Sequence, residues 1–289
     1  MKTILIYSSK QPFVQNDINI LECDEYKVIT NKKGYLSELI FFIKNRYDKY
    51  YIWFNDIHAL IPVIIAKLTF RKSIIFAGGY DAVYIPELNY GALNGSFRSK
   101  IIKLIYKLAD RVVVPSLDLY SKLKIHIRKD IEIIHSSINT QFWKPEKLER
   151  VYDFVTVGNI KDSNTFYRKG IDKFFHSASE HPDKKFVLIG NFSNELQKPR
   201  LHNLTITGYL DVEYLKFFLN KSIHYCQLSR YESFGYALIE AMSMGCIPIV
   251  NDAGIMKFIA GDVKTTEQAR QRVIELFSNQ LRKQKILEL

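Results

Sequence analysis

The chain has 289 residues, of which 47% are hydrophobic and 25% charged, so it can bury a core and is not a disordered or fibrous protein. No apolar run reaches the roughly 18 residues that a membrane-spanning helix needs, and the best candidate, Leu60 to Phe70, is interrupted by Lys67. The formal net charge of +11 favours anionic partners such as phosphates, an acidic membrane surface or nucleic acid.

The opening residues MKTILIYSS contain only four apolar residues in a row, which predicts a buried strand rather than a secretory signal. The cysteines Cys23, Cys226 and Cys246 lie far apart without the spacing of a metal site. They are expected to be reduced thiols of a cytoplasmic protein.

Short apolar runs alternate with segments of helical period in the first half of the chain, which is typical of a parallel α/β sheet. Helices are predicted at Tyr35–Asn45, Ile57–Leu68 and Ser96–Ala109. The predicted strands are Thr3–Tyr7, Tyr26–Thr30, Tyr51–Phe54, Ser73–Phe76, Arg111–Pro115 and Ile131–Ile134.

The segment Ser96–Ala109 is predicted to be a basic amphipathic helix. One stripe contains Phe97, Ile101, Ile105 and Leu108, and lysines and an arginine flank it. Such a helix fits either an ordinary surface position or contact with an anionic membrane, which would place the protein at the inner face of the membrane.

A second α/β series follows a charged, proline-containing segment around Phe142–Val151, which reads as a linker. We therefore expect one domain at 1–148 and another at 149–289, with Glu267–Leu287 as one final helix that packs back on the first domain. The second series has strands at Asp153–Val157, Phe186–Ile189, Leu204–Thr207, His224–Gln227 and Ile247–Val250, and helices around Gly170–Ser179, Val212–Leu219 and Phe234–Met244.

The stretch SRYESFGYALIEAMSMGCIPIV, at 229–250, is the most informative part of the sequence. A polar loop precedes a helix that Gly245 ends, because glycine accepts left-handed geometry. The loop presents backbone N–H groups at a helix N-terminus, which can bind an anion. Glu232 lies at the start of the helix, and Glu240 lies about two turns further on. The position of Glu240 between Ile239 and Ala241 is unusual for a charge without a function.

This stretch resembles family 4 glycosyltransferases, whose signature is two glutamates separated by seven residues. The matching residues are Ser229, Glu232, Ser233, Phe234, Gly235, Glu240, Ala241, Met242, Gly245 and Pro248. The resemblance implies the GT-B fold, in which two Rossmann-like parallel-sheet domains face each other across a cleft. It also implies that Glu240 binds the ribose of a nucleotide, that Glu232 binds a hydroxyl of the donor sugar, and that amides near Phe234 and Gly235 meet the sugar or diphosphate.

A second match, VTVGNIKDSNTFYRKGIDKF at 155–174, implies a diphosphate site. Lys169 fits the lysine that the family places against the donor phosphates. Gly158 ends a strand, but Asn159 follows it where relatives usually have arginine. Arg168 is the candidate that could compensate.

The stretch IFAGGYDAVYIPELNYGAL, at 74–93, resembles the family less closely. Gly78 occupies the position of a family histidine, which indicates a subgroup with the sequence G-G-Y-D. The candidates for the polar residue on the acceptor side are Asp81, Tyr80, Glu87 and His58.

The resemblance implies a retaining glycosyltransferase in which Glu232, Lys169 and Asp81 take catalytic roles. The donor would be a nucleotide sugar, and the acceptor a saccharide or a lipid-linked saccharide. No D-x-D sequence occurs, so no metal or other cofactor is expected, and no module for nucleic acid is visible. Two alternatives stay open, namely a different enzyme on this fold, such as a nucleotide-sugar epimerase or a phosphorylase, and a non-catalytic sugar-nucleotide-binding scaffold.

Overall fold

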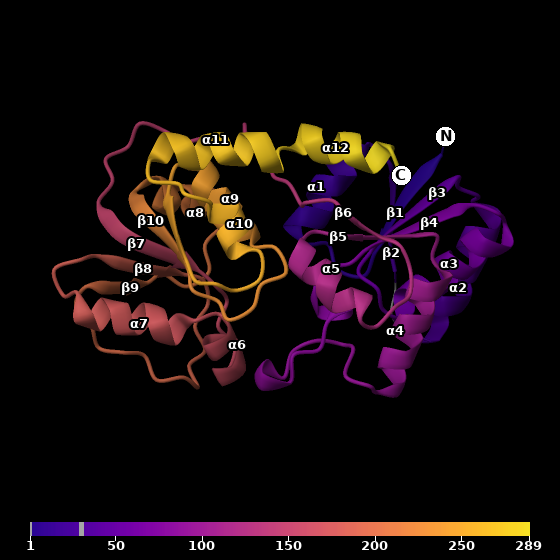
Figure 1. Cartoon of the computed structure of the whole chain (residues 1–289), viewed down its shortest axis with the longest axis horizontal. Coiled ribbons are helices and arrows are strands. Elements are labelled where there is room, and N and C mark those ends of the chain that lie inside the picture. The colour runs from indigo at the N-terminus through magenta and orange to yellow at the C-terminus, as the bar shows by residue number, and fades with distance from the viewer. Residues whose placement is uncertain (1, 29–31) are drawn as a thin grey trace. The chain divides into compact units, whose positions relative to one another are not determined.

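The computed structural model describes residues 2–28 and 32–289 of the chain (Figure 1). Its contacts divide the chain into two units. Unit 1 comprises Met1–Ser137 with Gln280–Leu289, and unit 2 comprises Ile138–Asn279. Each unit is built around a parallel sheet with helices, so the predicted α/β fold class is confirmed.

The sheet of unit 1 has six parallel strands in the order β2-β1-β3-β4-β5-β6. Five of them were predicted from their short apolar runs. The prediction Tyr26–Thr30 overlaps β2 only at Tyr26 and Lys27, because β2 begins at Asp24, and residues 29–30 of that prediction lie outside the described residues. The strands are β1 (Thr3–Tyr7), β2 (Asp24–Lys27), β3 (Lys49–Trp53), β4 (Lys72–Phe76), β5 (Arg111–Val114) and β6 (Ile131–Ile133).

Helices cover both faces of this sheet, with α1 and α12 on one face and α2, α3 and α4 on the other (Figure 1). Leu5, Trp53 and Phe76 share a core with Ile286 and Leu289 at the end of the chain. The helices are α1 (Pro12–Leu21), α2 (Lys32–Lys44), α3 (Leu60–Leu68), α4 (Phe97–Leu108), α5 (Leu117–Lys124) and α12 (Asn279–Leu287), with 3-10 turns η1 (Ile57–Ala59), η2 (Tyr80–Ala82) and η3 (Pro86–Leu88).

The helix α4 buries a different stripe from the one that the sequence predicted. Ile102, Ile105 and Tyr106 are fully buried, whereas Phe97 is 79% exposed. Ser96 caps the helix, so Phe97 lies in its first turn, beyond the part that packs on the sheet. Of the predicted stripe, Ile105 is fully buried, Ile101 and Leu108 are partly exposed, and Phe97 is exposed.

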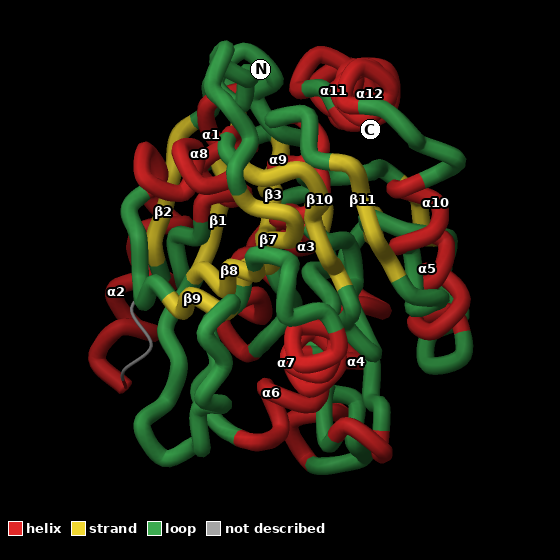
Figure 2. Tube along the Cα trace, turned by 90° about the vertical axis from the view of Figure 1, so that its left-hand side faces the viewer, coloured by secondary structure: helices red, strands yellow, loops and turns green. Residues whose placement is uncertain are grey.

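The sheet of unit 2 has five parallel strands in the order β11-β10-β7-β8-β9. Figure 2 shows α7 on one face of this sheet and α9 on the other. The strands are β7 (Tyr152–Val157), β8 (Phe186–Ile189), β9 (Leu204–Ile206), β10 (Ser222–Gln227) and β11 (Ile247–Val250), and the helices are α6 (Ser163–Arg168), α7 (Ile171–Glu180), α8 (Val212–Asn220), α9 (Tyr236–Ser243), α10 (Met256–Ala260) and α11 (Thr266–Phe277).

The boundary between the units lies between Ser137 and Ile138, before the expected division at 148 and 149. Ile138 and Trp143 are buried in the core of unit 2. The Arg270 guanidinium donates to the carbonyl oxygens of Trp143 at 2.9 Å and Thr140 at 3.0 Å. These contacts hold the start of the segment around Phe142–Val151 against unit 2. Its proline and charges had predicted a linker, but the segment belongs to unit 2.

The expected single helix Glu267–Leu287 is broken at Ser278, shortly before the chain returns from unit 2 to unit 1 at Gln280. Ser278 has an extended backbone, with φ −77° and ψ 152°, and it forms a bridge with Ile138. The Ile138 amide also donates to the Phe277 carbonyl oxygen at 3.0 Å. The prediction of one continuous helix was wrong because this pairing is a tertiary contact between residues far apart in the sequence.

Candidate active site

The candidate site lies in unit 2, where β10 ends in a loop that leads into α9. Gly235 begins this helix in the left-handed region, at φ +98°, and an added Cβ would lie 2.8 Å from Met256 Cε. Gly245 follows the end of the helix at φ +81°, as the sequence predicted. Glycine is required at both positions because a side chain makes this conformation unfavourable.

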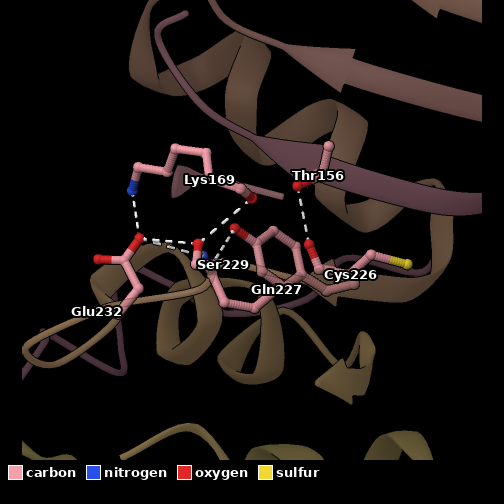
Figure 3. A network of polar contacts seen from close by, with 7 residues as sticks. Thr156, Lys169, Cys226, Gln227, Ser229 and Glu232 are labelled. Carbon is pink, nitrogen blue, oxygen red and sulfur yellow. Dashed lines mark hydrogen bonds and ion pairs between the residues drawn. The ribbon is translucent and has the colours of Figure 1, made fainter. Parts of the chain in front are cut away.

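Buried polar side chains gather between the end of β10 and this loop (Figure 3). Gln227 Nε2 donates to Ser229 Oγ at 2.7 Å and lies 3.3 Å from Glu232 Oε1. Ser229 Oγ is itself 3.1 Å from the same carboxylate oxygen, and the Tyr225 hydroxyl donates to Gln227 Oε1 at 3.1 Å. The network fixes the position of the Glu232 carboxylate.

Lys169 reaches this network from the end of α6. Its ammonium forms an ion pair with Glu232 Oε1, and the two side chains are only 24% and 14% exposed (Figure 3). Gly170 makes this approach possible, because it has φ +69° and an added Cβ would lie 1.9 Å from the Leu228 carbonyl oxygen. The two sequence motifs are therefore brought together by a backbone contact that only glycine permits.

The charge of Glu232 is stabilised by its neighbours. Burial by itself raises the pKa of this carboxyl, but the Lys169 ammonium, the Arg168 charge and the Ser229 hydroxyl outweigh it, so the pKa is lowered overall. Glu232 is therefore ionised at neutral pH and can accept hydrogen bonds from hydroxyl groups.

Glu240 lies on α9 in a different environment. Burial raises its pKa to about 8, although the side chain keeps some exposure to solvent. Burial, and then the charges of Glu232 and Glu240, raise the pKa of Tyr225, so both acids lie near this one phenol.

The remaining residues predicted at the site lie in the loops that follow β7 and β10. The Phe234 ring is 2% exposed and packs edge-on against Phe277, so only its backbone is available to a ligand. Gly158 follows β7, and Asn159 Oδ1 accepts a hydrogen bond from the backbone amide of Asn191 at 3.0 Å. Ser233 lies partly exposed in the loop between Glu232 and α9.

In unit 1, Asp81 is 5% exposed and accepts four hydrogen bonds. One oxygen accepts from the amides of Gly78 and Gly79, both at 2.9 Å. The other accepts from the Asn55 amide at 2.8 Å and the Tyr106 hydroxyl at 3.1 Å. These bonds organise the glycine loop, and a direct catalytic role for Asp81 stays a prediction.

A cavity of about 220 Å³ lies beside this loop in unit 1. His58, whose pKa is lowered by burial, lines it together with the Asp56–Arg98 ion pair. Of the four acceptor-side candidates, Tyr80, Asp81 and His58 line this cavity, whereas Glu87 lies exposed in η3.

A family model described as glycosyl transferases group 1 matches residues 137–285, a range that includes the whole of unit 2. The chain belongs to this family. It is therefore a glycosyltransferase, as the sequence predicted.

Solved structures similar to this glycosyltransferase show the GT-B fold. Sucrose-phosphate synthase from Thermosynechococcus elongatus has a TM-score of 0.72 at 14% identity, covering 100% of this chain and 98% of its own. The lipopolysaccharide outer core galactosyltransferase WaaB, in its apo form, has a TM-score of 0.67 at 14% identity, with coverage of 100% and 98%. A search of curated proteins finds no match to the sequence.

The pneumococcal O-GlcNAc transferase GtfA, solved with UDP and GlcNAc, is a further similar structure. Its TM-score is 0.63 at 11% identity, over 90% of this chain and 60% of that one. At such identities the likeness concerns the fold alone.

The site of this glycosyltransferase also contains residues that sequence reasoning missed. Gln227 and Tyr225 lie in β10 and read as part of a buried strand. Arg230 forms a paired contact with Asp172 at 2.8 and 2.6 Å, and its guanidinium lies 3.5 Å from the centre of the Tyr167 ring. It thereby holds the loop against α6 and α7. The position of Gln227 at the carboxyl end of a strand was the one available signal.

Within residues 2–28 and 32–289, the structure shows no group of three or more His, Cys, Asp or Glu side chains arranged to hold a metal ion. Over the same part of the chain, no helix is long and apolar enough to cross a bilayer.

Proposed function

We propose that this protein is a retaining family 4 glycosyltransferase of the G-G-Y-D subgroup, which moves a sugar from a nucleotide sugar to a saccharide or lipid-linked acceptor. The observation that carries the proposal is the contact of Lys169 with Glu232 on the buried Gln227–Ser229 network. The Lys169 ammonium can bind phosphates, and the oriented Glu232 carboxylate can bind hydroxyl groups. A ligand that carries both kinds of group therefore fits this partly buried site.

In this proposal Lys169 exchanges its partner when the donor binds. Its ammonium moves from Glu232 to the diphosphate, and Arg168 and the amides of Ser233, Phe234 and Gly235 add further positive charge or donors. The freed Glu232 carboxylate accepts a hydrogen bond from a hydroxyl of the donor sugar. The Glu240 carboxylate is ionised in the complex and accepts hydrogen bonds from the ribose hydroxyls.

The chemical step breaks the bond between the anomeric carbon and the β-phosphate oxygen and forms a bond to the acceptor oxygen on the same face. The acceptor proton passes to the departing diphosphate. The protein provides orientation and stabilises the charge that develops on the leaving group. We propose that this step needs no metal and no other cofactor.

The donor is tested first by thermal shift with UDP-, GDP- and ADP-sugars, because a ligand that binds only the folded state raises the melting temperature. UDP is the first choice, since the similar pneumococcal transferase was solved with UDP. One nucleotide sugar should raise the melting temperature of the native chain, and Glu240→Gln should reduce that shift.

Turnover is then measured as release of the nucleoside diphosphate by the native chain, with and without an acceptor extract. Lys169→Met should lower kcat/KM about 100- to 1000-fold, because it removes a charge aimed at the leaving group. Glu275→Gln, at an exposed position of α11, is the matched control. Equal activity of Lys169→Met and the control contradicts the proposal, and a product sugar that stays on the nucleotide identifies an epimerase instead.

A further inference from the structure

Three neighbouring helices of unit 1 present apolar side chains to solvent. Helix α3 contacts both α2 and α4, and the three cover one face of the sheet (Figure 1). We define the docking face by its exposed apolar residues, which are Leu36, Leu39, Ile40, Ile43, Ile64, Leu68, Phe70, Phe97 and Leu104. Exposed apolar residues in this number on adjoining helices indicate an interaction surface.

The exposed charged residues on these three helices are basic. Lys44, Lys67, Lys100 and Lys107 are exposed on the three helices. The one acidic residue in the sequences of these helices is Glu38, which is 1% exposed and so faces inward. An anionic surface placed against these helices would therefore be attracted by the lysines and would not be repelled by an acidic side chain of the same helices.

Phe70 is the most exposed residue of the docking face and has an unfavourable backbone. Its φ is 55°. The Phe70 amide donates to the Lys67 carbonyl oxygen at 3.3 Å, and the Arg71 amide donates to the Ala66 carbonyl oxygen at 2.8 Å. This pattern ends a helix and normally uses glycine at the left-handed position. The chain instead keeps a phenylalanine whose side chain is 97% exposed, which indicates a function for the ring.

The combination of lysine and exposed aliphatic residues distinguishes between lipid and protein as the partner. Lysine is depleted in protein–protein interfaces, because its charge and flexible chain are costly to bury there. At a bilayer, the apolar side chains enter the boundary of the acyl region while the lysines reach the headgroup phosphates.

We propose that the docking face lies on an anionic membrane, with α2, α3 and α4 along the bilayer surface and Phe70 inserted below the headgroups. The exposed apolar residues extend from Leu36 near the start of α2 to Ile43 near its end, so contact along the whole helical layer is possible. The proposal does not depend on the identity of the donor or acceptor.

Co-sedimentation of the full chain with two kinds of vesicle tests this proposal. One kind contains phosphatidylcholine alone, and the other contains phosphatidylcholine with phosphatidylglycerol. The protein should bind the second kind more strongly. Lys100→Glu and Lys107→Glu should each weaken binding about fivefold or more, since a lysine near an anionic surface contributes on this scale. Lys173→Glu, on α7 of unit 2, should leave binding unchanged.

The apolar contribution is tested with Phe70→Asn, because asparagine tolerates the left-handed backbone. This variant should lose vesicle binding while melting at the same or a higher temperature. Tyr214→Gln, at an exposed position of α8, is its control. The proposal is overturned if the native chain binds neither kind of vesicle, or if Phe70→Asn binds as the native chain does. It is likewise overturned if the chain sediments as a dimer that Phe70→Asn converts to a monomer, since a second copy then covers the face.

Discussion

At the scale of single residues, Glu240 makes the stability of the empty protein depend on pH. Its carboxyl has a pKa of about 8 when folded, against 4.5 as the ordinary value. Between these values the unfolded chain has lost the proton that the folded chain still holds, so stability falls as the pH rises through this range. The loss should reach about 1–2 kcal/mol once the partial exposure of the side chain is allowed for.

Replacing Glu240 with glutamine should therefore remove this loss. Urea unfolding from pH 5 to pH 8.5 should show a flatter dependence for Glu240→Gln than for the native chain, and higher stability at the alkaline end. A variant that follows the native curve across the whole range would show that Glu240 is well solvated.

Single residues also show how far the site could be predicted. Glu232 and Lys169 were identified because their local sequence patterns are distinctive, and the structure brings them into contact. The arrangement around Gly78 was not predictable, because it depends on a distant residue. An added Cβ on Gly78 would lie 1.9 Å from the Phe54 ring, so Phe54 occupies the space that a side chain at this position would need.

At the scale of elements, α12 is held in unit 1 by a buried ion pair. Arg282 Nε and a terminal nitrogen each lie 2.7 Å from an oxygen of Asp17, and these side chains are 3% and 1% exposed. The Trp53 indole N–H donates to the same carboxylate at 2.8 Å. Arg282→Met should cost about 3–5 kcal/mol of folding free energy, because it leaves a buried carboxylate without its counter-charge.

Lys283→Gln is the matched control for Arg282→Met. Lys283 lies next in the sequence and pairs with Glu22, but these side chains are 40% and 76% exposed. Its replacement should change stability by no more than about 0.5 kcal/mol, because an exposed ion pair contributes little. Similar losses for the two variants in urea unfolding would refute a special contribution of the buried pair.

Elements with a clear apolar period were predicted, and those without one were missed. Most strands of both sheets follow from short apolar runs rich in aliphatic and aromatic residues, whereas β2, with the sequence DEYK, does not. Helix α1 was overlooked because its sequence, PFVQNDINIL, contains several polar residues, one of which is the buried Asp17. Asp17 is tolerated there because Arg282, from the other end of the chain, neutralises it.

At the scale of the whole molecule, the two units draw their cores from different parts of the chain. The cores of unit 2 are formed within residues 138–277, whereas unit 1 needs Ile286 and Leu289 from the C-terminus. Removal of residues 280–289 should therefore destabilise unit 1 and leave unit 2 folded.

Hydrogen–deuterium exchange of the truncated chain would check this. Amides of β1 and β3 should exchange faster than in the full chain, while those of β7 and β8 should keep their protection. Any thermal shift with a nucleotide sugar should persist in unit 2. Equal loss of protection in both sheets would mean that the units do not fold as separate bodies.

The sequence by itself determined the α/β class of both units, the glycosyltransferase family and the two motifs at the centre of the candidate site. These features are local, because they depend on apolar periodicity and on glycines and acids at fixed spacing. Only the tertiary structure decided where unit 1 ends, why the last helix breaks at Ser278 and which buried partners orient Glu232. Those features arise from contacts between residues far apart in the chain, which a local pattern does not encode.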